Sequence, residues 1–278
     1  MAGRAPGLLA DTPARDYVHK LQLFNAFAEP ELRQAIASLD LQRGMRILDA
    51  GCGSGEALSW LAEEVGAAGL AVGLDLAAAH AAASRARAPP ASAVLQADVC
   101  RPPLVRGSFD LVWAVNTVNH LREPLQAVRQ LATLLRSGGR VALGQSSLLP
   151  EMFFAWDARL ERLTCEAVRR YYRERYRLEE RELAAVRSLV GLLRAAPLRE
   201  VMVRTLIIER VAPLRAADEA YLIEGIFRNT WGERLRPYLA REDFAELTHL
   251  CDPGDCRFAL KRPDFHFLQT FTLALGKA

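Results

Sequence analysis

The 278-residue sequence has few cysteines and no long apolar run. Its five cysteines are scattered, with no CxxC pair and no spacing typical of metal ligands, so we predict reduced thiols and no metal site. No apolar stretch approaches the roughly 20 residues that span a bilayer. The first residues also place proline and aspartate where a signal peptide needs its apolar core. These absences argue against a disulfide scaffold and a membrane protein, and they predict a cytoplasmic location.

A strong net charge is also missing. Lys and Arg give the chain a net charge of only +3 over Asp and Glu, and the arginines are spread through Ala- and Leu-rich segments. This distribution is typical of a solvated surface rather than of a nucleic-acid footprint. The segment 171–182 combines Tyr with Arg, but its Arg and Glu charges largely cancel. We therefore expect a small-molecule substrate and neither nucleic acid nor membrane as a partner; the composition leaves the oligomeric state undefined.

Short apolar runs alternate with helical stretches between residues 45 and 147. Strands are expected at 46–50, 70–75, 92–98, 109–115 and 140–146, with helices at 54–66, 77–88 and 123–136. Alternation of this kind is typical of βαβ units around a parallel sheet that is buried on both faces. The sequence therefore predicts an α/β protein with a Rossmann-like, doubly wound, mostly parallel sheet.

The alternation stops after residue 147, which suggests four parts. A helical N-terminal segment (1–45) precedes the core (46–147), and a helical insertion (148–198) would form a cap. The last part (199–278) returns to the core, with strands expected at 201–211 and 265–276 and helices at 216–231 and 241–251.

The strongest local signal is DAGCGSG, residues 49–55, between the first strand and its helix. Gly51, Gly53 and Gly55 allow a tight turn and a close approach of the backbone to a ligand, and the helix that follows presents unpaired N–H groups to an anion. Asp75 ends the second strand, where a carboxylate can bind ribose hydroxyls. These features predict a nucleoside ligand, and the glycine turn alone allows either a dinucleotide or another adenosine-containing cofactor.

Three acidic residues at successive strand ends distinguish these alternatives. Asp49 precedes the glycines, Asp75 ends strand two, and Asp98 follows strand three. In this order they resemble the class I methyltransferases that use S-adenosylmethionine (SAM). The resemblance implies that Asp75 and Leu76 contact the nucleoside, that Asp98 faces the adenine amino group, and that Val99 adds backbone contacts.

The segment NTVNHLREP, residues 116–124, resembles the stretch after strand four in small-molecule methyltransferases of the ubiquinone-biosynthesis type. The D/N-P-P-Y/F/W run of DNA amino-methyltransferases does not occur there. Asn116 is a candidate to bind the methionine end of SAM or the incoming nucleophile. His120 has a side chain whose usual pKa suits proton transfer at neutral pH; the alternative is that it caps or packs against the next helix.

The N-terminal helix (16–36) resembles the lid helix that folds over SAM in this family, which would place the Tyr17 ring near the sulfonium cation. The alternative is an amphipathic helix that packs on the sheet. In the expected cap, Tyr172 and Tyr176 are candidates to orient a nucleophile through their hydroxyl groups.

These observations support one leading function and two alternatives. The first is methyl transfer from SAM to a small molecule, in bacterial specialised metabolism. The second is a SAM cyclase related to azetidine-2-carboxylate synthases, which would release methylthioadenosine. The third is a SAM-binding module without catalysis.

Overall fold

The computed structural model describes residues 17–147, 153–154, 156–176 and 185–278. Its sheet has the strand order β3-β2-β1-β4-β5-β8-β6, and β7 pairs with β8. The strands are β1 (Arg46–Ala50), β2 (Leu70–Asp75), β3 (Ser92–Gln96), β4 (Phe109–Val115), β5 (Leu135–Ser146), β6 (Phe153–Phe154), β7 (Arg199–Val211) and β8 (His266–Lys277). β1 to β5 are parallel, whereas β8 is antiparallel to β5, β6 and β7. The predicted doubly wound, mostly parallel sheet is confirmed.

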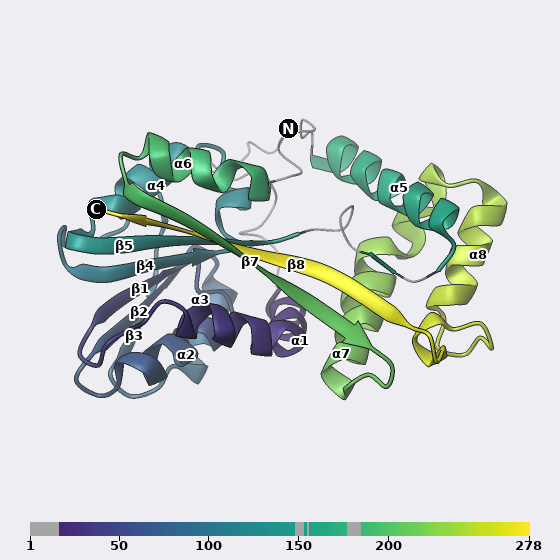
Figure 1. The fold of residues 1–278 in the computed structure, drawn as a ribbon, viewed down its shortest axis with the longest axis horizontal. Helices are drawn as coiled ribbons and strands as arrows, with labels where there is room; N and C mark the ends of the chain where they lie inside the picture. The colour runs from purple at the N-terminus through teal and green to yellow at the C-terminus, as the bar shows by residue number, and fades with distance from the viewer. Residues whose placement is uncertain (1–16, 148–152, 155, 177–184) are drawn as a thin grey trace.

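Helices cover both faces of this sheet. They are α1 (Val18–Ala37), α2 (Glu56–Val65), α3 (Ala78–Arg87), η2 (Val118–His120), α4 (Pro124–Ala132), α5 (Ala158–Tyr176), η4 (Ala185–Ser188), α6 (Leu189–Ala195), α7 (Ala216–Ala220), η5 (Tyr221–Trp231), η6 (Gly232–Tyr238), α8 (Arg241–Cys251) and η7 (Ala259–Lys261). Helices α1, α2 and α3 lie on one face, and α4 and α6 lie on the other (Figure 1). The alternation of side chains along each strand therefore divides the core: Ile47 and Leu111 pack toward α1 and α2, and Leu48 and Val112 toward α4 and α6.

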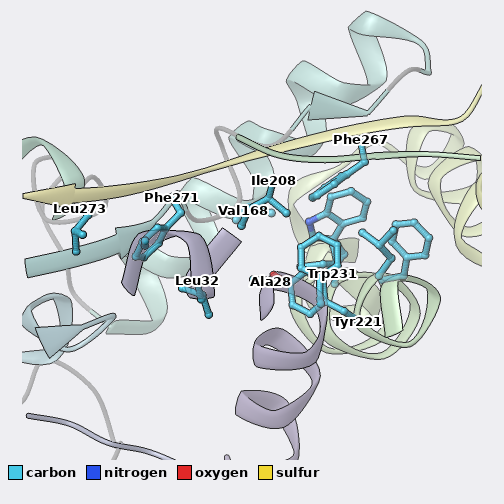
Figure 2. Close-up of a cluster of buried hydrophobic side chains, with 14 of the residues drawn as sticks. Ala28, Leu32, Val168, Ile208, Tyr221, Trp231, Phe267, Phe271 and Leu273 are labelled. Carbon is cyan, nitrogen blue, oxygen red and sulfur yellow. The ribbon is translucent and has the colours of Figure 1, made fainter. Parts of the chain in front are cut away.

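A second layer of helices gathers at one end of the long strands β7 and β8 (Figure 1). We call α5, α7, η5, η6 and α8 the cap. Aromatic rings join the cap to the core: Phe27 of α1 stacks on Tyr221 of η5 at 4.3 Å between ring centroids and meets Phe267 of β8 edge-on at 5.8 Å. Figure 2 shows Tyr221, Trp231 and Phe267 in this cluster beside α1. The lid helix and the cap therefore share one apolar core.

Two of the differences from the sequence prediction change how the elements pack. The helix expected at 123–136 ends at Ala132, because Leu135 joins β5 opposite Phe109 and the residues that follow form a register shift with Gly138 at φ 78°. The segment expected as one insertion, 148–198, is split. Its helix α5 packs against η6 of the cap, whereas α6 packs against α4, β7 and β8 of the core.

Candidate active site

The glycine turn leaves β1 at the carboxyl edge of the sheet. Gly51, Gly53 and Gly55 have φ angles of 86°, 52° and 90°, in the region that side-chain-bearing residues avoid. At Gly51, a Cβ would lie 2.8 Å from the methyl carbon of Thr117, so the turn has no room for a side chain at this position. The turn ends at Gly55, the residue before α2. The N-terminus of α2 therefore lies at the carboxyl edge of the sheet, where the connections after the neighbouring strands β1 and β4 run to opposite faces. Open α/β sheets bind ligands at this kind of position.

Asp75 fixes this turn from the end of β2. Its Oδ2 accepts a hydrogen bond from the Gly53 N–H at 2.9 Å, and its Oδ1 accepts one from the Ala77 N–H at 2.9 Å. The Nδ1 atom of His80 lies 3.4 Å from Oδ1. The side chain of the next residue, Leu76, is 36% exposed, which is unusual for a leucine beside a buried strand. The carboxylate predicted to bind a ribose thus also shapes the glycine turn, next to an exposed apolar surface.

Asp49 is a buried carboxyl group in an acidic environment. Only 2% of it is exposed, and its Oδ2 has no hydrogen-bond partner among the described residues. Burial, together with the charges of Asp75 and Glu56, raises the pKa of Asp49 to about 8. Glu56 begins α2 and is held by Ser54 Oγ at 2.5 Å and by Asn25 Nδ2 at 2.8 Å. Arg87 also pairs with the Glu56 Oε1 at 3.0 Å. Asp49 is thus mostly uncharged at neutral pH, and a cationic ligand nearby would favour its ionised form.

The Asp49→Asn variant is expected to be more stable than the wild-type protein above pH 8 and about equally stable near pH 4. The pKa of Asp49 is higher in the folded state than in the unfolded state. Its contribution to the free energy of unfolding is therefore fully present below the unfolded pKa and is lost as the pH rises through about 8. The loss is at most about 1.4 kcal/mol per pH unit. Urea denaturation at pH 5 and pH 9 would measure it.

Asp110 provides the matched control for this variant. It is also buried in a strand, but it pairs with Arg136 and accepts a hydrogen bond from the Arg46 N–H at 2.8 Å. Asp110→Asn weakens these contacts and is expected to destabilise the protein at both pH values. A wild-type-like pH dependence of stability in Asp49→Asn would contradict the assignment of the raised pKa to Asp49.

Asp98 and Val99 follow β3 at the same edge of the sheet. The Asp98 Oδ1 accepts a hydrogen bond from the Cys100 N–H at 2.8 Å, and its backbone carbonyl accepts one from the Arg101 N–H at 3.0 Å. Val99 is 7% exposed and packs against the α4 side of the sheet. These bonds hold the Asp98 carboxylate in a tight turn, at the position where the sequence predicts the adenine contact.

The end of β4 is shaped by Asn116 and Thr117. Asn116 has a φ of 51°, and its Oδ1 accepts hydrogen bonds from the Ser146 N–H at 2.8 Å and the Ser146 Oγ at 3.0 Å. The side-chain oxygen of Asn116 is therefore already hydrogen-bonded to Ser146 of β5, and we expect a ligand to bind its amide N–H groups. Thr117 Oγ1 lies 3.1 Å from the Ala50 carbonyl oxygen and 3.0 Å from that of Val115, which fixes it against Gly51.

His120 ends the short helix η2 and differs from the expectation for a neutral-pH base. Burial lowers its pKa to about 4, with further lowering by Lys20 and His80 against the opposing effect of Asp75. The pKa of His120 is therefore lower than the usual histidine value on which its candidacy as a base rested. At neutral pH His120 is uncharged, so it can accept a hydrogen bond but is a weak base.

Helix α1 reaches the glycine turn from the lid side. Tyr17 directly precedes α1, and one turn later a methyl carbon of Leu21 lies 3.0 Å from where a Gly53 Cβ would be. His19 Nε2 pairs with Glu224 Oε2 of η5 at 2.8 Å. The start of α1 thus lies between the glycine turn and the cap.

The two tyrosines predicted in the cap both belong to α5. Tyr172 packs edge-on against Tyr171 at 5.4 Å between ring centroids, and it borders the buried cluster that contains Tyr221. Tyr176 is the last residue of α5, and its side chain lies outside the described part of the structure. The structure therefore brings the predicted residues of the core strands together at one edge. It places Tyr17 one turn before Leu21 at the start of α1, and Tyr172 in the cap.

Sequence reasoning missed several residues at this edge. Lys20 approaches His120, and burial together with Arg234 of η6 lowers its pKa. Glu56 has a recognisable signal, since an acidic residue at the start of a helix after a glycine turn complements the helix dipole. Thr117 has no recognisable sequence signal beyond its place next to Asn116, because its contact with Gly51 joins segments that are distant in the chain.

Among the described residues, no group of His, Cys, Asp or Glu is arranged to hold a metal ion. No described helix is long and apolar enough to cross a membrane.

A doubly wound sheet with this strand order, a glycine turn after β1 and acidic residues after β2 and β3 defines the class I methyltransferase fold. Residues 48–143 match the methyltransferase domain family, a segment that ends within β5. The chain thus contains a class I SAM-dependent methyltransferase domain, with SAM as the cofactor of that domain, as the sequence predicted.

Individual relatives agree with this class. Over 115 residues the chain is 35% identical to a 27-O-demethylrifamycin SV methyltransferase of Amycolatopsis mediterranei, covering 40% of this chain and 42% of the relative. Over 125 residues it is 38% identical to a malonyl-[acyl-carrier protein] O-methyltransferase of Enterobacter lignolyticus, covering 44% and 48%. The chain thus matches less than half the length of these curated relatives.

A solved structure extends the likeness of fold to nearly the whole chain. Phosphoethanolamine N-methyltransferase 2 of Haemonchus contortus, in complex with SAM, matches with a TM-score of 0.56 at 14% identity. The match covers 99% of this chain and 60% of that one.

Proposed function

We propose that this protein transfers the methyl group of SAM to a small-molecule acceptor bound between the glycine turn, α1 and the cap. The observation that carries the proposal is the turn itself. Three glycines with positive φ lie at the carboxyl edge of a parallel sheet, and the carboxylate of Asp75 accepts a hydrogen bond from the N–H of the middle one, Gly53. This arrangement supports a ligand that combines an adenosine with an anionic group, as SAM does.

The residues predicted at the ends of the core strands support this ligand. Asp75 and Leu76 would contact the ribose and one face of the adenine, and Asp98 would accept a hydrogen bond from the adenine amino group. The glycine turn and the amide of Asn116 would hold the methionine part. These contacts are proposals drawn from the positions of the residues at the carboxyl edge.

The electrostatics favour SAM over its neutral product. SAM carries a sulfonium and an ammonium group, and the carboxyl groups of Asp49, Glu56 and Asp75 interact with one another at this edge. A cationic ligand would relieve their mutual repulsion and lower the pKa of Asp49. His120, which is uncharged at neutral pH, adds no opposing charge beside the sulfonium.

Catalysis would then depend on placement. The acceptor lone pair forms the new bond to the methyl carbon while the electrons of the carbon–sulfur bond stay on the sulfur. A hydroxyl or amine acceptor releases its proton to the solvent. Holding the acceptor in line with that bond, away from water, supplies much of the rate enhancement. Asn116 and Tyr172 are the proposed orienting groups, and His120 is a proposed hydrogen-bond acceptor.

The relatives support a small-molecule acceptor. Besides the two described above, a nocamycin O-methyltransferase of Saccharothrix syringae is 34% identical over 121 residues. Names of this kind are consistent with a hydroxyl or carboxyl acceptor and a role in specialised metabolism. Because the family match ends at residue 143, the cap would determine which acceptor binds.

Incubation of the purified chain with SAM, first alone and then with a panel of hydroxyl, carboxyl and amine acceptors, would test the proposal. We expect SAM to remain intact alone and S-adenosylhomocysteine to form with at least one acceptor, as followed by mass spectrometry. Release of methylthioadenosine from SAM alone would instead support the cyclisation alternative. Binding of SAM without any turnover across the panel would contradict the proposal and support a binding module.

A further inference from the structure

Strand β7 is an edge of the sheet with a long free side. It pairs only with β8 among the described strands, and its register with β8 is regular from Met202 to Val211. A register shift lies before Met202. The unpaired N–H and C=O groups of a long, regular edge strand form a template for another strand.

This edge is also unusually apolar. Met202, Val203, Ile207 and Val211 are 50 to 60% exposed, and they account for four of the six large apolar side chains that are exposed in the described structure. Between Met202 and Val211 there is no proline, glycine or lysine, and the charged residues are Arg204, Glu209 and Arg210. Monomeric proteins usually protect such an edge with charges, prolines or bulges, and here the register shift lies outside this stretch.

We propose that β7 pairs with β7 of a second copy of this chain, antiparallel about a two-fold axis at Thr205, so that the two sheets become continuous. A two-fold axis through the centre of the strand makes the interface self-complementary. Val203 then lies opposite the partner's Ile207, and Met202 lies opposite the partner's Ile208. Thr205 lies opposite its own copy.

Alternative registers are less favourable. A two-fold axis at Arg204 would place that arginine opposite its own copy, and an axis at Ile207 would place Arg204 opposite the partner's Arg210. Like charges directly opposite one another destabilise a sheet. An axis at Leu206 avoids this but places Val203 opposite the partner's Glu209. The Thr205 axis sets Val203 against the partner's Ile207 and places no like charges opposite one another.

The proposed interface is separate from the proposed active site. The glycine turn follows β1, in the middle of the sheet, whereas β7 lies at one edge (Figure 1). Dimer formation and SAM binding can therefore be measured and can fail independently.

A cysteine at the two-fold axis gives the sharpest test. Directly opposite residues in antiparallel strands have Cα atoms about 4.5 to 5.5 Å apart, within the range of a disulfide. In a Cys256→Ser background, which removes the exposed native thiol, Thr205→Cys is expected to form a covalent dimer under mild oxidation. Val203→Cys is the control, because its copies would be about 13 Å apart along the strands. Equal crosslinking of the two variants, or none in Thr205→Cys, would overturn the proposed register.

Sedimentation of the full chain tests the interface itself. The wild-type protein is expected at twice its 30.8 kDa mass, and Ile207→Lys at 30.8 kDa. Val105→Lys, at an apolar position that is 76% exposed but lies away from β7, should stay dimeric. Circular dichroism checks that each variant is folded. A monomeric wild-type protein at high micromolar concentration, or a dimeric Ile207→Lys, would overturn the proposal.

Discussion

Replacing Arg210 by Met is expected to lower the free energy of unfolding by about 3 to 5 kcal/mol, the range for breaking a buried ion pair. The Arg210 side chain is 10% exposed and donates hydrogen bonds to Glu31 of α1 at 2.8 and 2.9 Å and to Asp218 of α7 at 2.8 Å. It also bonds to the Phe27 carbonyl oxygen and covers the Phe27 ring at 4.7 Å. Methionine would fill much of the space but would leave Glu31 and Asp218 without this cation.

The matched control is Arg236→Met. Arg236 forms a two-bond pair with Glu233, at 2.6 and 2.8 Å, but both side chains are more than 60% exposed. Exposed pairs contribute about 0 to 1 kcal/mol, so this variant should differ little from the wild-type protein in urea denaturation. Equal losses in the two variants would show that the buried network does not hold α1 to the cap. A loss confined to Arg210→Met would identify this network as the link between lid and cap.

Gly51→Ala is expected to weaken SAM binding by about 100-fold or more. A φ of 86° costs an alanine about 1 to 2 kcal/mol, and its Cβ would also press on the Thr117 side chain, which two carbonyl oxygens hold in place. The turn must therefore shift, and about 2.7 kcal/mol corresponds to a hundredfold change in affinity. Isothermal titration of SAM would measure it.

Two other glycines separate strain from contact in this experiment. Gly107 has a φ of 67° but nothing within 4 Å of the position that a Cβ would take, so Gly107→Ala carries the backbone strain without the clash. Gly191 lies inside α6 with open space and no positive φ, so Gly191→Ala should be neutral or slightly stabilising. Both variants should bind SAM like the wild-type protein. Unchanged affinity in Gly51→Ala would remove the glycine turn from the proposed cofactor site.

Much of the core could be predicted because its signals are local. The strands at 46–50, 70–75 and 109–115 have the predicted bounds, since a short apolar run between turn residues is a property of neighbouring residues. The positive φ angles at Gly51, Gly53 and Gly55 were also predictable, because glycine placement is a local signal. The end of α4 was missed because Leu134 and Leu135 continue the helical pattern and pairing with β4 overrides it.

The cap and the electrostatics could not be predicted in this way. Arg210 and Glu31 are 179 residues apart in the chain, and no local pattern links them. The lowered pKa of His120 and the raised pKa of Asp49 arise from burial and from charges that other segments bring close. The exposed side of β7 is likewise visible only once its pairing with β8 is known.

The sequence by itself therefore determined the fold class, the order of the core elements and the glycine turn, because hydrophobic periodicity and glycine placement act over a few residues. The tertiary structure alone decided which helices form the cap, how α1 is held over the glycine turn and which carboxyl and imidazole groups change their pKa. Those properties depend on contacts between segments that are distant in the chain, and on the loss of water around them, which no short stretch of sequence encodes.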